Sequence, residues 1–136
     1  MDIRVLQPGD EALLGDAVAA SEGVTIGARQ AAEHLADPSL VAIVAVVDGA
    51  AVALFYGFVL KRFRQTDFFL YSAGVAAAYR RRGIGKAMLA RLHALRAERG
   101  WTGIFVLTNA GNAGAMALYR SGGGVRPSAD DVLFDF

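Results

Sequence analysis

The segment from Val75 to Leu89 constrains this chain more than any other. It joins the end of an apolar stretch to three consecutive arginines, then to Gly83 and Gly85, and then to the first turns of an amphipathic helix. The start of a helix presents unpaired backbone N–H groups and a partial positive charge, and glycine lets a ligand approach that backbone closely. The segment therefore predicts a site for an anion, and a pyrophosphate suits it best.

Positive charge is concentrated around this segment. Ten of the 14 basic residues lie between Lys61 and Arg99, where the only acids are Asp67 and Glu98, although the net charge of the chain is only +1. Such a distribution suits an anionic ligand bound at one place. Proteins that bind nucleic acid usually carry more positive charge overall, so we expect no nucleic-acid partner and rank that function last.

The composition is that of a globular domain, with 54% hydrophobic and 20% charged residues among 136. No apolar run reaches the roughly 18 residues of a membrane span, and the N-terminus lacks the layout of a signal peptide. We expect one domain over residues 1–136, a cytoplasmic location and no membrane partner. The chain has no cysteine and only two histidines, His34 and His93, so we expect no metal.

Before the glycine-arginine segment, the sequence predicts four strands and two helices. The first expected helix spans residues 11–22, with Asp10 as its N-terminal cap and Gly23 as its end. The second spans residues 25–37 and is ended by Pro38. Asp48-Gly49 separates two apolar runs, which is a strong signal for a β-hairpin. The expected strands are residues 2–6, 40–47, 50–60 and 68–75.

After Gly83, the sequence predicts a helix that ends at Gly100, a short apolar strand over residues 104–107, a helix over residues 112–119 and a last strand over residues 132–136. A strand, a crossover helix and a strand imply one parallel pair, whereas hairpins are antiparallel. The expected fold class is therefore α/β (α+β) with a mixed sheet.

Two motifs resemble those of the Gcn5-related N-acetyltransferases. The pyrophosphate signature of that superfamily, Arg or Gln, two variable residues, Gly, one variable residue and Gly or Ala, matches residues 80–85, and a second signature matches Asn112, Ala115, Leu118 and Tyr119. The resemblance implies a mostly antiparallel mixed sheet of six to seven strands flanked by four helices, with acetyl-CoA as co-substrate and a homodimer as the assembly.

Within that superfamily, the layout is most similar to the small aminoglycoside 3-N-acetyltransferases. Shared features are the run from Val59 to Phe63, Tyr71 three residues before Gly74, and the ending Phe134-Asp135-Phe136. Two departures concern the acceptor: Ser72 stands where that family usually carries aspartate, and the loop of residues 109–112 is neutral rather than acidic. An aminoglycoside is polycationic, so these departures bear on the substrate and not on acetyl transfer.

The resemblance also implies roles for individual residues. The backbone of Gly74, Val75 and Ala76 is expected to run beside the pantetheine arm, and Asn112 to hydrogen-bond its amides. Tyr119 is the candidate acid that protonates the departing thiolate. Ser72 and Asp135 are expected near the acceptor, with Asp135 or a water chain as the base. The expected CoA-binding residues are Gly74, Val75, Ala76, Arg80, Arg81, Arg82, Gly83, Ile84, Gly85, Lys86, Asn112, Ala115 and Tyr119.

The reaction so implied is direct transfer of acetyl from acetyl-CoA to a primary amine of a small polycationic acceptor, an aminoglycoside in an antibiotic-resistance enzyme. Two alternatives stay open at this point. In the first, the acceptor is another amine, such as a polyamine, an amino acid, a protein N-terminus or a lysine. In the second, the chain is a non-catalytic sensor of acyl-CoA, which is suggested by Ser72 in place of the family's aspartate.

Overall fold

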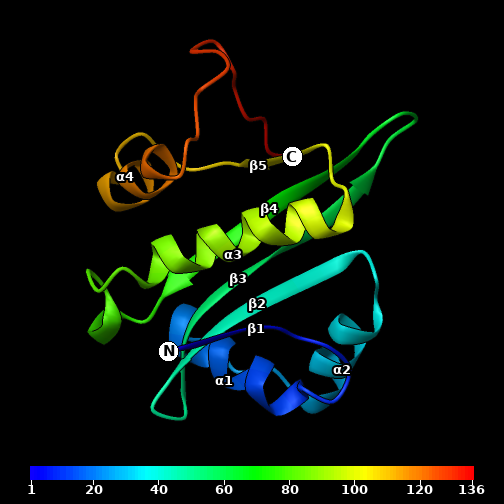
Figure 1. Cartoon of the computed structure of the whole chain (residues 1–136), viewed down its shortest axis with the longest axis vertical. Coiled ribbons are helices and arrows are strands. Elements are labelled where there is room, and N and C mark those ends of the chain that lie inside the picture. Colours follow the sequence, from blue (N-terminus) through cyan, green and yellow to red (C-terminus); the bar gives the residue numbers. More distant parts are fainter.

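A computed structural model describes all residues from 1 to 136 (Figure 1). It contains five strands, four α-helices and one short 3₁₀ helix, η1, over Ala77–Tyr79. The strands are β1 (Asp2–Val5), β2 (Leu40–Val47), β3 (Ala50–Lys61), β4 (Thr66–Val75) and β5 (Gly103–Val106). The helices are α1 (Glu11–Glu22), α2 (Ala28–Ala36), α3 (Ile84–Arg99) and α4 (Ala113–Ser121).

The strands form one mixed sheet in the order β1-β2-β3-β4-β5. The first three pairings are antiparallel, and β4 pairs with β5 in parallel after the α3 crossover. The mixed, mostly antiparallel sheet with four flanking helices is therefore confirmed. The turn between β2 and β3 places both Asp48 and Gly49 at positive φ, 49° and 79°, as a tight hairpin turn requires.

The expected count of six to seven strands is wrong, because the last strand does not form. Residues 125–136 have no regular secondary structure, and Val132, Leu133, Phe134 and Phe136 are all exposed. An alternating pattern makes a strand only when a partner strand offers its backbone. The nearest edge in the sheet, β5, is four residues long, and the chain end pairs with none of it.

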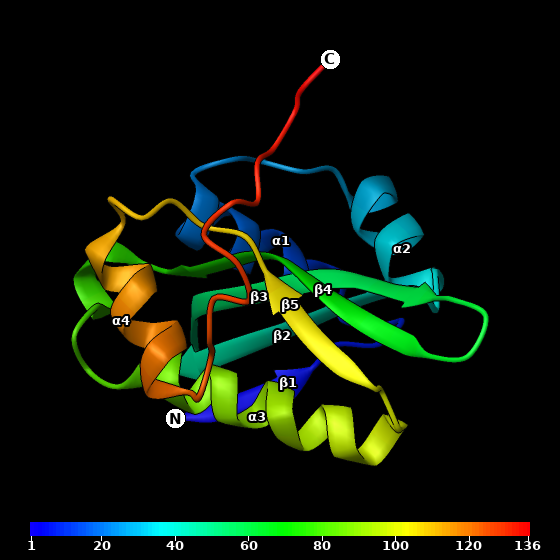
Figure 2. The same ribbon diagram turned by 90° about the horizontal axis from the view of Figure 1, so that it is seen from above.

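Helices cover both faces of the sheet (Figure 2). On one face, Met88, Leu92 and Leu95 of α3 pack on alternate side chains of the strands, including Phe55 and Phe68. On the other face, α1 and α2 pack on the opposite set of side chains, including Ala42, Val44 and Leu54. The strand β2 is buried from both sides, which explains its eight consecutive apolar residues.

The helix ends follow the sequence closely, with two differences. Gly23 and Gly100 end α1 and α3 in the left-handed conformation. Asp10 precedes α1 but its side chain does not cap the helix and instead accepts a hydrogen bond from the backbone N–H of Gln7, 2.9 Å away. The second helix begins at Ala28 and not at residue 25, because Gly27 is extended and Gln30 bonds back to its N–H.

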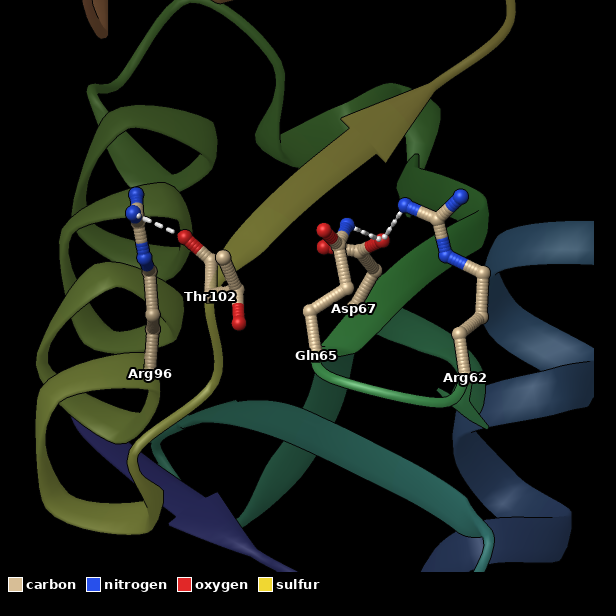
Figure 3. A network of polar contacts seen from close by, with 5 residues as sticks. All are labelled: Arg62, Gln65, Asp67, Arg96 and Thr102. Carbon is tan, nitrogen blue, oxygen red and sulfur yellow. Dashed lines mark hydrogen bonds and ion pairs between the residues drawn. The ribbon is translucent and has the colours of Figure 1, made fainter.

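A polar network fixes the end of the sheet where β4 and β5 begin (Figure 3). The buried carboxylate of Asp67 accepts hydrogen bonds from Arg62 at 2.7 Å and from Gln65 at 2.8 Å. These bonds lower the pKa of Asp67, with the Gln65 bond as the largest cause. Arg96 at the end of α3 donates to the carbonyls of Trp101 and Thr102, so α3 and β5 are tied together.

No helix of the chain combines the length and the apolar content that crossing a bilayer requires.

Candidate active site

The turn between η1 and α3 is shaped as an anion site. Arg81 and Gly83 both have positive φ, 63° and 79°, so two residues just before the helix lie in a region of φ that residues with side chains rarely adopt. No backbone N–H group from Arg81 to Lys86 donates a hydrogen bond within the chain. A row of free N–H groups at the start of a sixteen-residue helix is a set of donors suited to phosphate oxygens.

The basic side chains around this turn are exposed. Arg80 folds back and donates from Nε to the carbonyl of Val75 at 3.1 Å, which fixes the turn to the end of β4. The guanidinium of Arg82 lies over the ring of Tyr79, 5.0 Å from its centre. Arg81 and Lys86 form no ion pair in the structure, so their charges are available to an anionic ligand.

Glycine is needed at the two positions of the motif for different structural reasons. A side chain on Gly83 would meet nothing within 4 Å, but the φ of 79° is one that other residues rarely adopt. A Cβ on Gly85 would lie 3.4 Å from Leu118 of α4, with φ in the ordinary helical range. Gly83 therefore shapes the anion site itself, whereas Gly85 allows α4 to pack against the start of α3.

The edge of β4 is open beside this turn. The pairing of β4 with β5 ends at Leu70 and Val106, so the residues of β4 from 71 onward have no strand partner on that side. On its other side β4 remains paired with β3 as far as Val75, and the N–H of Ala76 donates to Val52 at 2.8 Å. The predicted pantetheine site at Gly74, Val75 and Ala76 is thus a rigid strand end with one free edge.

Gly74 packs against the end of α1. Its missing side chain would point at α1, where a Cβ would stand 3.1 Å from the Cβ of Ser21. Glycine at this position therefore lets the end of α1 lie directly on β4. The contact brings the last residues of α1 beside the open edge.

The second motif lies on α4. The side chain of Asn112 caps this helix by accepting from the N–H of Ala115 at 3.1 Å, so its oxygen is engaged while its amide N–H₂ stays free. Tyr119 is half-buried among core side chains, and burial raises the pKa of its phenol. A neutral phenol is a hydrogen-bond donor, as the predicted role of Tyr119 requires.

A hollow of about 260 Å³ opens on the opposite face of the sheet, between α1, α2 and β3. Six of its nine lining residues are hydrophobic, and Glu22 is its only acid. Its lining residues are Leu14, Val18, Glu22, Val24, Ile26, Gln30, His34, Leu54 and Tyr56. This hollow has the character of a small-molecule site, apolar with a few polar groups.

The polar groups of the hollow come from separate elements. Ser72 of β4 donates to the carboxylate of Glu22 on α1 at 2.7 Å. The pKa of Tyr56 is raised by burial and by the negative charge of Glu22. His34 of α2 lies edge-on to Tyr56, with ring centres 6.0 Å apart, and its buried Nε2 has no hydrogen-bond partner. Burial lowers the pKa of His34 more than Asp37 raises it.

One residue beside this hollow, Ser72, is among the sequence-predicted site residues. Ser72 was expected near the acceptor, and the structure places it beside the hollow. Asp135 lies in the exposed chain end, and no hydrogen bond or ion pair joins it to Ser72 or Tyr119. Glu22 and Tyr56 were missed, because they lie 50 and 16 residues from Ser72 and no local pattern marks them.

Solved structures share this architecture. The crystal structure of aminoglycoside acetyltransferase HMB0005 from an uncultured soil metagenomic sample is 29% identical, with a TM-score of 0.88 over 99% of this chain and 96% of that chain. A ribosomal-protein-alanine N-acetyltransferase from Brucella melitensis biovar Abortus 2308 is 20% identical, with a TM-score of 0.78 over 99% and 100% of the two chains. Aminoglycoside N-acetyltransferase AAC(6')-Iy in complex with CoA is 18% identical, with a TM-score of 0.76 over 99% of this chain and 98% of that chain.

At 20% identity or below, the second and third of these show only the common fold. No curated protein matches the chain in sequence. Residues 15–123, which hold the anion turn, the open strand edge and Tyr119, match the acetyltransferase (GNAT) family, whose members use acetyl-CoA. The chain therefore belongs to the acetyltransferase (GNAT) family.

Proposed function

We propose that this protein transfers an acetyl group directly from acetyl-CoA to a primary amine of a small acceptor. The observation that carries the proposal is the continuous run from the open edge of β4 to the free N–H groups of residues 81–86. A strand edge suits the amides of pantetheine, and the N–H groups with their arginines suit the pyrophosphate. The residues present therefore fit both the pantetheine arm and the pyrophosphate of CoA.

Acetyl-CoA, when bound, supplies an activated thioester. The chain's part is to hold that group at the strand edge, to offer a backbone N–H of residues 74–76 to the carbonyl oxygen, and to donate a proton from Tyr119 to the sulfur. The amine nitrogen forms the new C–N bond as the C–S bond breaks. An ammonium loses two protons and the sulfur takes one, so one proton is released in each transfer.

An aminoglycoside is the first candidate acceptor. The similarity to HMB0005, 29% identical over nearly the whole of both chains, supports this substrate class. A second observation favours a different amine: the hollow is mostly apolar and holds one acid, Glu22, whereas a polycation needs several. Both candidate functions are transfer of acetyl from acetyl-CoA to an amine, and they differ only in which amine is the acceptor.

Thiol release from acetyl-CoA tests the proposal. The purified protein is assayed with 3-amino aminoglycosides, polyamines, amino acids, monoamines and short peptides, each at saturating acetyl-CoA. Release with aminoglycosides supports a resistance-type enzyme, and release only with other amines supports the second candidate. Tight CoA binding without release from any acceptor would overturn the proposed catalysis and favour a sensor of acyl-CoA.

A further inference from the structure

The last residue of α1 carries a carboxylate that no sequence motif marks. Glu22 is exposed, it accepts a hydrogen bond from Ser72 at 2.7 Å, and it forms no ion pair with any lysine or arginine. The bond joins two residues that are 50 positions apart in the chain. A carboxylate that is held in place by a hydroxyl, with no cation beside it, is available to a cationic ligand.

This carboxylate lies beside the stretch of β4 that we propose holds the thioester. Ser72 and Gly74 are two residues apart on one strand, so their side-chain positions share a face. That face meets the end of α1 at both places, through the bond from Ser72 to Glu22 and through the contact of Gly74 with Ser21. Glu22 is therefore next to the reacting end of the predicted cofactor site.

The same carboxylate is the only acid of the hollow between α1, α2 and β3. The ring of Tyr56 lies close enough that the charge of Glu22 raises the pKa of the phenol, and the ring of Tyr71 lies tilted beside that of Tyr56, with ring centres 5.8 Å apart. An ammonium group held against Glu22 would keep its carbon skeleton on an apolar and aromatic wall. One cationic head on an apolar body is the chemistry that this arrangement recognises.

We infer that Glu22 binds the ammonium group of the acceptor, and that Ser72 positions its carboxylate. The ligand class is a primary alkylammonium that enters the hollow with one positive charge. The inference rests on the proposed function for its place in a reaction, but binding of the amine to Glu22 can be measured without turnover.

Direct titration separates the two proposals. Benzylamine is the probe, because it is a primary ammonium on a small apolar body, and benzyl alcohol is its neutral counterpart. The CoA-bound protein is titrated with each by calorimetry. Glu22→Gln should weaken benzylamine binding about ten- to hundredfold, the range for a charge-assisted contact, and should leave benzyl alcohol within twofold. Equal weakening of both ligands, or none, would overturn the inference.

Two further variants sharpen the result. Asp16→Asn removes an exposed charge from the same helix, and binding should stay within twofold. In the double variant Glu22→Gln with Ser72→Asp, the new carboxylate stands on the residue whose oxygen now lies 2.7 Å from Glu22, so benzylamine affinity should recover at least tenfold. Failure of this rescue would mean that the carboxylate itself does not bind the amine.

A purely structural role predicts a different pattern. If the bond from Ser72 to Glu22 only ties α1 to β4, then Glu22→Gln and Ser72→Ala should lower Tm together and amine affinity should be unchanged. Because the bond is exposed, we expect both variants to keep Tm within about 2 °C. If benzylamine binds as described and no acceptor in the thiol assay turns over, the inference stands and the proposed catalysis fails.

Discussion

The two sides of the candidate site use different chemical groups, backbone N–H groups on one side and side chains on the other. On the proposed cofactor side, the donors are backbone N–H groups of one short segment, residues 81–86, and of the adjoining end of β4. On the proposed acceptor side, the polar groups are side chains: Glu22 from α1, His34 from α2, Tyr56 from β3 and Ser72 from β4. One side is continuous in sequence and the other is assembled by the fold.

This difference fits the ligands that we propose for the two sides. Backbone donors fixed by a turn and a helix start suit a ligand part that never changes, such as a pyrophosphate. Side chains brought from four elements can each be replaced without disturbing the sheet, which suits an acceptor that differs among related enzymes. Changes on the cofactor side should therefore affect CoA with every acceptor, and changes on the acceptor side should affect only the amine.

The largest effect is expected from Gly83→Val. Valine is strained at a φ of 79°, so the turn that exposes the N–H groups should be lost. The dissociation constant of CoA, measured by calorimetry, should rise at least about a hundredfold, since several charge-assisted hydrogen bonds are lost together.

A matched variant at the other end of α3 provides the control. Gly100 has a φ of 68° and, like Gly83, no atom within 4 Å of an added side chain. Gly100→Val should therefore destabilise folding to a similar degree, seen as a similar fall in Tm, and leave CoA binding unchanged. Loss of CoA binding in both variants would show that the effect comes from general destabilisation of the helix and not from the anion site.

A smaller effect is expected from Tyr119→Phe, which separates chemistry from binding. The ring and its packing stay, and only the hydroxyl is removed, so kcat should fall about 10²- to 10³-fold while the Kd of CoA stays within twofold. Burial raises the pKa of this phenol above its usual 10.0, so it stays protonated through neutral and mildly alkaline pH. A loss of CoA affinity equal to the loss of kcat would contradict the assigned role.

The features that the sequence predicted are those with local causes. Apolar periodicity, the Asp48-Gly49 turn and the left-handed glycines that end α1 and α3 are each set by neighbouring residues, and all are found. The anion turn is equally local, because six consecutive residues carry it. A pattern within one segment is sufficient to predict a structural feature when the residues that stabilise this feature lie in the same segment.

The features that the sequence could not supply depend on partners far along the chain. The ending at residues 132–136 has the alternation of a strand, but no strand edge accepts it. Gly74 and Gly85 look alike as flexible residues, yet one is required by Ser21 of α1 and the other by Leu118 of α4. Glu22 became a candidate only when the fold placed it against Ser72.

The smallest expected effect concerns His34, on the acceptor side. Burial lowers its pKa from 6.5, so the unfolded chain binds a proton more readily than the folded one. Its contribution to stability is therefore full above pH 6.5 and is lost as the pH falls below that value toward the folded pKa. Asp37 opposes this shift without cancelling it.

His34→Gln should remove this dependence. Between pH 7.5 and 5.5 the Tm of the wild type should fall about 1–3 °C further than that of the variant, measured by calorimetric scans in matched buffers. The other histidine, His93, is exposed on α3 and serves as control through His93→Gln, which should retain the wild-type fall. The Kd of CoA should not differ between the two variants at pH 7.5, because His34 lies in the hollow between α1, α2 and β3, and the N–H groups that we propose for CoA binding belong to the turn before α3. A change in CoA affinity in His34→Gln would mean that the two sides of the site are coupled, and that the division between backbone and side-chain recognition does not hold.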